Sequence, residues 1–204
     1  ERHLPELMLL AIENHGLEAK AARPVIKAMV QSRNHDMIAQ IMPLMTEASP
    51  DLAVRMLDSL HRISGQEKFT IQPSALEIAL PLLGEAEFET VRTLCSNARV
   101  IGDVKLLADA LQGVDERAIR FAVTLAGRAD KAGDAKLAES MLEKAASDLL
   151  GIEGHSQGSI AKNIAKGFEK LGMVDRAAEI KPMRTPVVIS TKVVNNDSPR
   201  KGHT

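Results

Sequence analysis

Apolar residues recur at helical spacing along almost the whole chain. In residues 134–150 they fall at steps of three and four, which places them on one side of a helix. Residues 159–171 repeat this spacing, with Ile160, Ile164 and Phe168 on the apolar side. Helix-breaking residues interrupt the pattern about every 12–20 residues, so the pattern predicts an all-α protein of short helices. About eleven helices are expected, at residues 4–14, 17–31, 36–47, 50–63, 74–83, 86–98, 103–112, 115–131, 134–150, 159–171 and 174–181.

Residues that suit helix starts precede several of these segments. Ser49 comes directly before Pro50, which combines an N-capping side chain with proline at the first helical position. Ser74 and Glu77 have the spacing of a capping box. Three further helices are expected to be capped by Asp103, Asp115 and Asp134.

One spacing of small residues recurs around turn glycines. Alanines lie seven residues before and five residues after two glycines: Ala126 and Ala138 around Gly133, and Ala165 and Ala177 around Gly172. A related spacing surrounds Gly16. Short helices with short connections lie antiparallel to their neighbours, and a helical hairpin buries its apolar side only when other hairpins stack against it. The pattern therefore favours a solenoid of stacked hairpins.

This spacing resembles the tetratricopeptide repeat, in which small residues occupy the helix crossing and glycine occupies the turn. The resemblance covers about half of the chain, and a HEAT-like stack would have a similar pattern. Most aromatic positions of the family hold Ala, Leu or Ile here, with Phe168 as the exception, and Gly84 lacks a matching set of residues after it. The resemblance implies a right-handed α-α superhelix of about five hairpins in one domain, residues 1–181. Its concave face would be formed by the first helices of successive hairpins.

The chain changes character after residue 181. Residues 187–194 are mostly β-branched, and prolines and asparagines flank them, so residues 182–204 are expected to form an extended or disordered basic tail. Residues 181–204 carry a net charge of +4, whereas residues 1–180 carry −5. The tail is either a terminal linker or a strand that adds to a partner's sheet edge or lies in the groove of the solenoid.

Composition and motifs argue against a catalytic function. The chain of 204 residues is 45% hydrophobic, with four Phe and no Trp or Tyr, which excludes a collagen, a disulfide scaffold or a wholly disordered chain. No apolar run is long enough to cross a bilayer, so no membrane insertion is expected. Cys95 falls among apolar residues at helical spacing and is predicted to be a buried small hydrophobe.

No motif for catalysis or for a cofactor emerges either. The six histidines lack zinc spacing, and we expect no metal site and no cofactor. Glu85, Glu87 and Glu89 suit a solvated helix start better than an acid–base pair. The glycines in residues 151–158 indicate a connection between helices, since the segment lacks the ending of a phosphate-binding loop. We therefore predict no catalytic residue and no enzymatic activity.

Basic side chains and methionines are the candidate binding features. Lys162, Lys166 and Lys170 recur every four residues on one side of a helix, with Arg176 nearby, and these four are the candidate contacts to a partner or to phosphate. Further surface candidates are Arg117, Arg120 and Arg128. The nine methionines are expected mainly to fill the core, and a methionine-rich groove that adapts to a partner helix is the alternative.

The first functional hypothesis is a protein-interaction scaffold or adaptor that binds a protein or peptide segment on the concave face. The alternatives are a nucleic-acid-binding helical repeat, carried by the lysines and the basic tail, and a regulatory domain of a larger enzyme. Base stacking on aromatics would favour nucleic acid, and this chain has few aromatics to offer. One cysteine fits the expected cytoplasmic location and also a bacterial periplasm. Because the chain begins at Glu1, a processed chain or a fragment is expected.

Overall fold

The computed structural model describes residues 42–43, 45–47, 49–67, 75–152, 154 and 156–181. Every regular element within these residues is a helix, as the sequence predicted, and none is a strand. The helices are α4 (Pro50–Glu67), α5 (Ala75–Ala79), the short 3-10 helix η1 (Leu80–Leu82), α6 (Phe88–Asn97), α7 (Ile101–Ala110), α8 (Glu116–Lys131), α9 (Ala135–Leu149), α10 (Gln157–Lys170) and α11 (Val174–Ile180). The helices predicted at 4–14 and 17–31, the Ser74 cap and the tail at 182–204 lie outside the described residues, as does most of the helix predicted at 36–47.

Side chains cap three helices where the sequence predicted caps. The Asp115 and Asp134 carboxylates accept hydrogen bonds from backbone amides three residues further on, at 2.7 and 3.0 Å, and begin α8 and α9. The Ser49 hydroxyl oxygen does the same for α4 at 3.4 Å. Each bond satisfies one of the amides that a helix start leaves without an intrahelical partner.

The predicted cap at Asp103 is wrong. Helix α7 begins at Ile101, after Val100, so Asp103 lies inside the first helical turn. Its carboxylate instead contacts the His61 ring nitrogen Nε2 at 2.8 Å, which joins α7 to α4. An acidic residue near a helix start suits the helix dipole whether or not it caps the helix. The sequence around Asp103 therefore could not distinguish a cap from a contact with a distant residue.

Two turns are built in the same way. Gly133 between α8 and α9 has φ +90°, and Gly172 between α10 and α11 has φ +78°. In each turn the glycine amide bonds to the carbonyl three residues back, at 2.9 and 3.1 Å, and the following amide bonds five residues back at 2.9 Å. This is the Schellman pattern, which satisfies the last carbonyls of a helix and needs a left-handed residue. The two predicted hairpins thus share one turn geometry.

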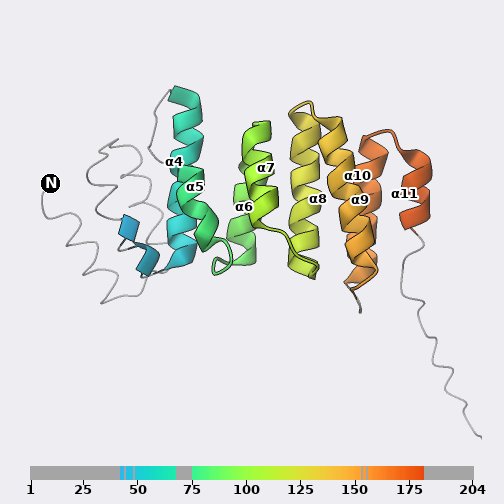
Figure 1. Ribbon diagram of the computed structural model, residues 1–204, viewed down its shortest axis with the longest axis horizontal. Coiled ribbons are helices and arrows are strands. Elements are labelled where there is room, and N and C mark those ends of the chain that lie inside the picture. Colours follow the sequence, from blue (N-terminus) through green and yellow to red (C-terminus); the bar gives the residue numbers. More distant parts are fainter. Residues whose placement is uncertain are drawn as a thin grey trace, which may run out of the picture.

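The helices lie side by side in a row from α4 to α11 (Figure 1). Helix α4 packs on α6, α6 on α8, and α8 on α10, while α9 packs on both α8 and α10. Helix α11 closes the row against α10. The middle is less regular than the C-terminal half, because the helix predicted at 74–83 divides into α5 and η1, with Pro81 inside η1. Consecutive even-numbered helices are therefore neighbours along the row.

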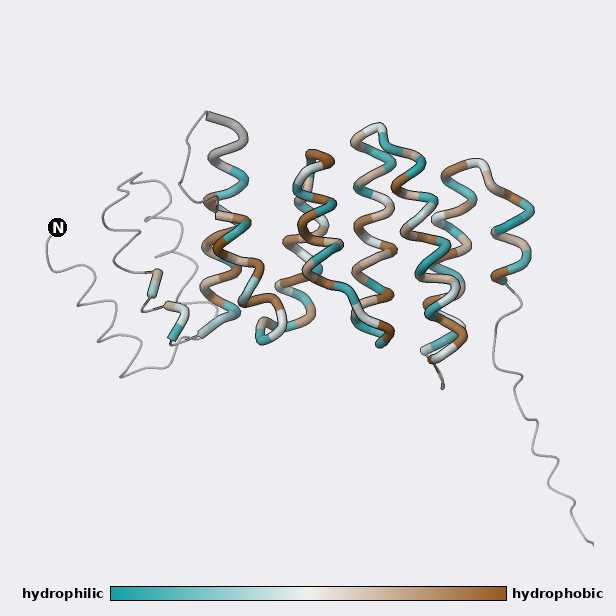
Figure 2. Tube along the Cα trace, in the orientation of Figure 1, coloured by the Kyte–Doolittle hydropathy of each residue, from teal (hydrophilic) through white to brown (hydrophobic). Residues whose placement is uncertain are grey.

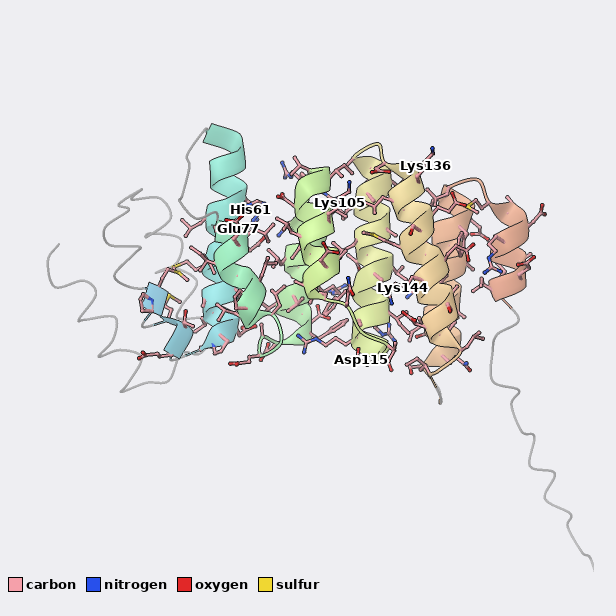
Figure 3. All side chains as sticks on the ribbon, in the orientation of Figure 1. His61, Glu77, Lys105, Asp115, Lys136 and Lys144 are labelled. Carbon is pink, nitrogen blue, oxygen red and sulfur yellow. The ribbon has the colours of Figure 1, made fainter. Side chains whose placement is uncertain are left out.

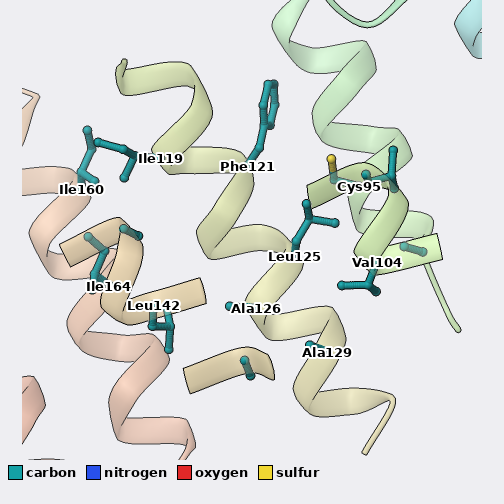
Figure 4. Close-up of a cluster of buried hydrophobic side chains, with 14 of the residues drawn as sticks. Cys95, Val104, Ile119, Phe121, Leu125, Ala126, Ala129, Leu142, Ile160 and Ile164 are labelled. Carbon is teal, nitrogen blue, oxygen red and sulfur yellow. The ribbon is translucent and has the colours of Figure 1, made fainter. Parts of the chain in front are cut away.

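The core runs between these helices. Hydrophobic and hydrophilic residues interchange along each helix in Figure 2, as amphipathic helices require. Figure 4 shows Cys95, Leu125, Leu142 and Ile164, which come from α6, α8, α9 and α10, in one buried cluster. The small residues predicted at the crossings are all buried: Ala126, Ala138, Ala165 and Ala177. Met42, Met45 and Met56 are also buried, in agreement with their expected role in the core.

Candidate binding groove

A groove with a volume of about 460 Å³ runs across α6, α8 and α10. Residues of α6 and α10 form its two sides, α8 lies between them, and two residues of α9 reach its floor. The groove is framed by regular helices, so its shape is fixed by the packing of the core beneath it. Preformed concave sites of this size suit a ligand or a short segment of a partner.

The groove occupies one side of α8 only. Thr124 and Gly127 line it, whereas Ala122 and Leu125 line a smaller cavity of about 200 Å³ between α7, α8 and α9. Positions two apart on a helix point in nearly opposite directions, since each residue turns the helix by about 100°. The two cavities therefore lie on opposite sides of α8, with the larger one on the side of the even-numbered helices.

Small and apolar residues form the floor of the groove. Ala126 of α8, and Ala138 and Leu142 of α9, are each only 1% exposed and lie at its bottom. Gly167 of α10 is packed against this floor, because a Cβ atom built there would lie 2.7 and 2.9 Å from the two methyl carbons of Leu142. Gly127 differs, since a Cβ atom there would meet nothing within 4 Å. The floor is thus closely packed at Gly167 and open above Gly127.

Two arginines at the rim are held by acidic neighbours. The Arg92 guanidinium of α6 bonds to Glu89 at 2.9 Å through Nε. The Arg120 guanidinium of α8 bonds to Glu116 at 2.9 Å and donates to the Ser159 hydroxyl of α10 at 3.1 Å. These bonds fix both arginines, and the Arg120 bond to Ser159 ties α8 to α10 at the groove.

Of the four predicted contact residues, two line the groove. Lys166 and Lys170 lie along its α10 side with Asn163, and all three side chains are exposed. In the described part of the chain neither lysine forms an ion pair. Lys162 is also exposed on α10 but does not line the groove. Sequence spacing placed the three lysines on one helix. In the structure the groove extends to Lys166 and Lys170 but not to Lys162.

Arg176, the fourth predicted contact, is engaged within the molecule and does not line the groove. Its guanidinium makes bonds of 2.7, 2.9 and 3.2 Å to the Glu143 carboxylate and also pairs with Glu179. It lies 5.9 Å from the centre of the Phe168 ring. This guanidinium holds the pKa of Glu143 below its ordinary value. Arg176 therefore joins α9 to α11 rather than standing free for a phosphate.

Arg117 and Arg128, two of the further surface candidates, form hydrogen bonds within the molecule. The Arg117 guanidinium donates to the carbonyls of Leu83 and Ala86 at 3.0 and 2.7 Å, and it lies 5.5 Å from the Phe121 ring centre. Arg128 donates to a carbonyl of the α6–α7 connection at 2.6 Å. Both side chains are half-buried. Sequence periodicity missed this role because carbonyls freed by irregular connections are their acceptors.

Other candidate groups fall outside the groove or belong to its rim. Cys95 is fully buried, as predicted, and burial raises the pKa of its thiol to about 12. Among the predicted acidic cluster, Glu89 pairs with Arg92, and the Glu87 carboxylate lies 3.6 Å from the Arg55 guanidinium. Within the described residues no group of three or more His, Cys, Asp or Glu side chains could hold a metal ion.

A buried polar link joins α4 to its neighbours. Asp58 is 5% exposed and accepts two hydrogen bonds from the Asn97 amide of α6, at 3.0 and 2.9 Å. Burial raises the pKa of Asp58 above its ordinary value, although the Asn97 bonds oppose this shift. The Asp103 hydrogen bond raises the pKa of His61 against the opposing effect of burial. These contacts hold α4 in register with α6 and α7.

Comparison with protein-family models, with curated proteins and with solved structures finds no match for this chain. Among the described residues no helix is both long enough and apolar enough to cross a membrane. The groove's geometry and the charges along it therefore carry the functional argument.

Proposed function

We propose that this chain is a protein-interaction module that binds a segment of a partner protein in the groove across α6, α8 and α10. In the proposed architecture, the helices form a right-handed, tetratricopeptide-like stack of hairpins, with α6, α8 and α10 as the first helices and α7, α9 and α11 as the second. The single observation that carries the proposal is the groove itself, which lies on the side of the first helices.

Packing supports this architecture in the C-terminal half. The α8–α9 and α10–α11 turns share one backbone geometry, and α8 packs directly on α10. A solenoid presents an extended surface that suits binding of a chain segment. The exposed lysines on α10 also keep nucleic acid as the second candidate, because Lys166 and Lys170 could contact phosphates.

Blocking the groove tests the proposal. Gly127 has open space around its Cβ position, so Gly127→Phe places a ring in the groove with the least disturbance of the core. Gly102 on α7 is equally open and does not line the groove, so Gly102→Phe is the matched control. The wild type and the two variants, each as the 204-residue chain, are used to select from a random-peptide display library.

The proposal predicts peptides that are enriched by the wild type and by Gly102→Phe and are lost with Gly127→Phe. Thermal melts of the variants check that both remain folded. Peptides that Gly127→Phe retains at wild-type level would place binding elsewhere and contradict the proposal.

A further inference from the structure

We infer that the groove takes an extended acidic segment, with two carboxylate side chains at alternate positions paired to Lys166 and Lys170. This inference rests on the proposed function and names the chemistry of its partner. It identifies these two lysines, rather than Lys162 or Arg176, as the residues that select the segment.

The charge of the groove points to an acidic partner. Four basic and two acidic side chains line it: Arg92, Arg120, Lys166 and Lys170 against Glu89 and Asp130. Glu89 and Glu116 pair with the two arginines, so the net charge is +1 with Glu116 counted, and Lys166 and Lys170 are the lining cations without an ion-pair partner among the described residues. The larger part of the chain, residues 1–180, carries −5. The groove is therefore a basic strip on an acidic body, and such a strip attracts and orients a segment of opposite charge.

The same charge argues against the chain's own tail as the occupant. Residues 181–204 carry a net charge of +4, the same sign as the groove. Like charges brought together across an interface oppose binding. A separate acidic segment is the occupant that the electrostatics favour.

The spacing of the lysines fits an extended chain. Lys166 and Lys170 are four residues apart on α10, which corresponds to about 6 Å along the helix axis. Side chains two apart on one side of an extended strand are separated by about 6.5–7 Å. Carboxylates at alternate positions of an extended segment would thus reach both ammonium groups at once.

The polar lining of the groove suits an extended segment. A groove of about 460 Å³ is large enough for a short segment of a partner chain. An extended backbone leaves its amides and carbonyls free, and they need partners. The Asn163 carboxamide, beside Lys166, can donate and accept hydrogen bonds to such a backbone.

The aromatic content of the groove favours a peptide over a nucleic acid. Binders of single strands stack bases on exposed rings, which contributes about 1–3 kcal/mol per base. Phe88 is the aromatic residue that lines the groove, and it is half-buried and already stacked on Phe121, with ring centres 5.1 Å apart. The two free lysines can pair with carboxylates without any stacking.

Binding of defined peptides tests the inference. The probe is a labelled nonapeptide with glutamates at alternate positions, and its controls replace glutamate by glutamine or place the same glutamates side by side. A labelled uridine decanucleotide serves as the nucleic-acid probe. Fluorescence anisotropy is measured at low salt with the full chain, with Lys166→Ala, with Lys170→Ala, and with Lys162→Ala as the matched control on the same helix.

The inference predicts that the alternating peptide binds most tightly. Each groove variant should weaken it about two- to fivefold, the effect expected for one exposed ion pair, and Lys162→Ala should not. Equal binding of the glutamine peptide, or an equal loss with Lys162→Ala, would overturn the inference. Equal binding of the peptide with adjacent glutamates would overturn the assigned spacing.

The remaining outcomes separate this inference from the function on which it rests. If the display selection yields groove-dependent peptides that lack acidic residues, the inference fails and the proposed function stands. If the selection yields no groove-dependent peptide and the alternating peptide does not bind, both fail. Tighter binding of the uridine probe that depends on Lys166 and Lys170 would overturn both in favour of a nucleic-acid interface.

Discussion

The turn between α8 and α9 gives the sharpest test of the fold, because one chemical change has opposite expected effects at two glycines. Gly133 adopts φ +90°, and its amide and the next one make the hydrogen bonds that end α8, both at 2.9 Å. Gly127 lies inside α8, and a Cβ atom there would meet nothing within 4 Å. Glycine is therefore required at the turn and is a weak residue in the helix.

The magnitudes follow from the two backbone conformations. Forcing a residue with a Cβ atom into the left-handed region costs about 1–2 kcal/mol, so Gly133→Ala should destabilise the protein by that amount. Alanine in place of a helical glycine stabilises by about 0.5–1 kcal/mol, so Gly127→Ala should be more stable than the wild type. In a domain of this size 1 kcal/mol corresponds to about 2–4 °C in Tm.

Thermal melts followed by circular dichroism measure both changes. The Tm of Gly133→Ala should fall by roughly 2–8 °C, and that of Gly127→Ala should rise by roughly 1–4 °C. A Gly133→Ala protein that melts at or above the wild-type temperature would refute the turn geometry. A clear fall for Gly127→Ala would refute the open space above that residue.

Three further predictions concern the core and the α4 contacts. Ala138→Leu should overpack the crossing at which Ala138 is 1% exposed and destabilise by about 1–3 kcal/mol in urea unfolding; wild-type stability would mean that the crossing is misplaced. The hydrogen bond to Asp103 raises the pKa of His61 in the folded state, so its stabilisation is fully present below about pH 6.5 and is lost as the pH rises through the folded-state pKa. The stability of the wild type relative to His61→Gln should therefore decrease as the pH rises above about 6.5, and a pH-independent difference would contradict the pairing. Cys95, buried with a pKa of about 12, should be alkylated by iodoacetamide only when the protein unfolds, and rapid alkylation of the folded protein would show that its helix opens locally.

Periodicity and capping predicted much of the described fold. The starts of α8 and α9 follow from Asp115 and Asp134, because a cap is a contact between residues three apart in sequence. The buried Ala126 and Ala138 follow from their spacing around Gly133, because a turn fixes the register of the two helices that it joins. These features are local, and local sequence determines them.

Hydrophobic periodicity and capping residues did not predict the long-range contacts. Asp103 has the sequence context of a cap, yet its partner His61 is 42 residues away. Arg117 has the spacing of a surface residue, yet it bonds to carbonyls more than 30 residues away. Such partners are chosen by the packing of helices, which sequence periodicity does not determine.

The candidate site also combines a local feature that the sequence predicted with a packing feature that it did not. The four-residue spacing of the lysines on α10 was visible in the sequence. Which of them line the groove depends on how α6, α8 and α10 pack. Gly127 and Gly167 carried no sequence signal for a groove, because glycine within a helix has many causes. Their different surroundings appear only when Leu142 of α9 is placed beside α10.

One measurement tests the central claim directly: a chemical-shift map of the full chain, titrated with a peptide from the display selection. Figure 3 labels Lys105 and Lys144, which belong to α7 and α9. The proposed groove predicts that the perturbed amides gather on α8 and α10, around Gly127 and Lys166, and leave those of Lys105 and Lys144 unchanged. Perturbations that gather instead around the smaller cavity between α7 and α9 would contradict the claim.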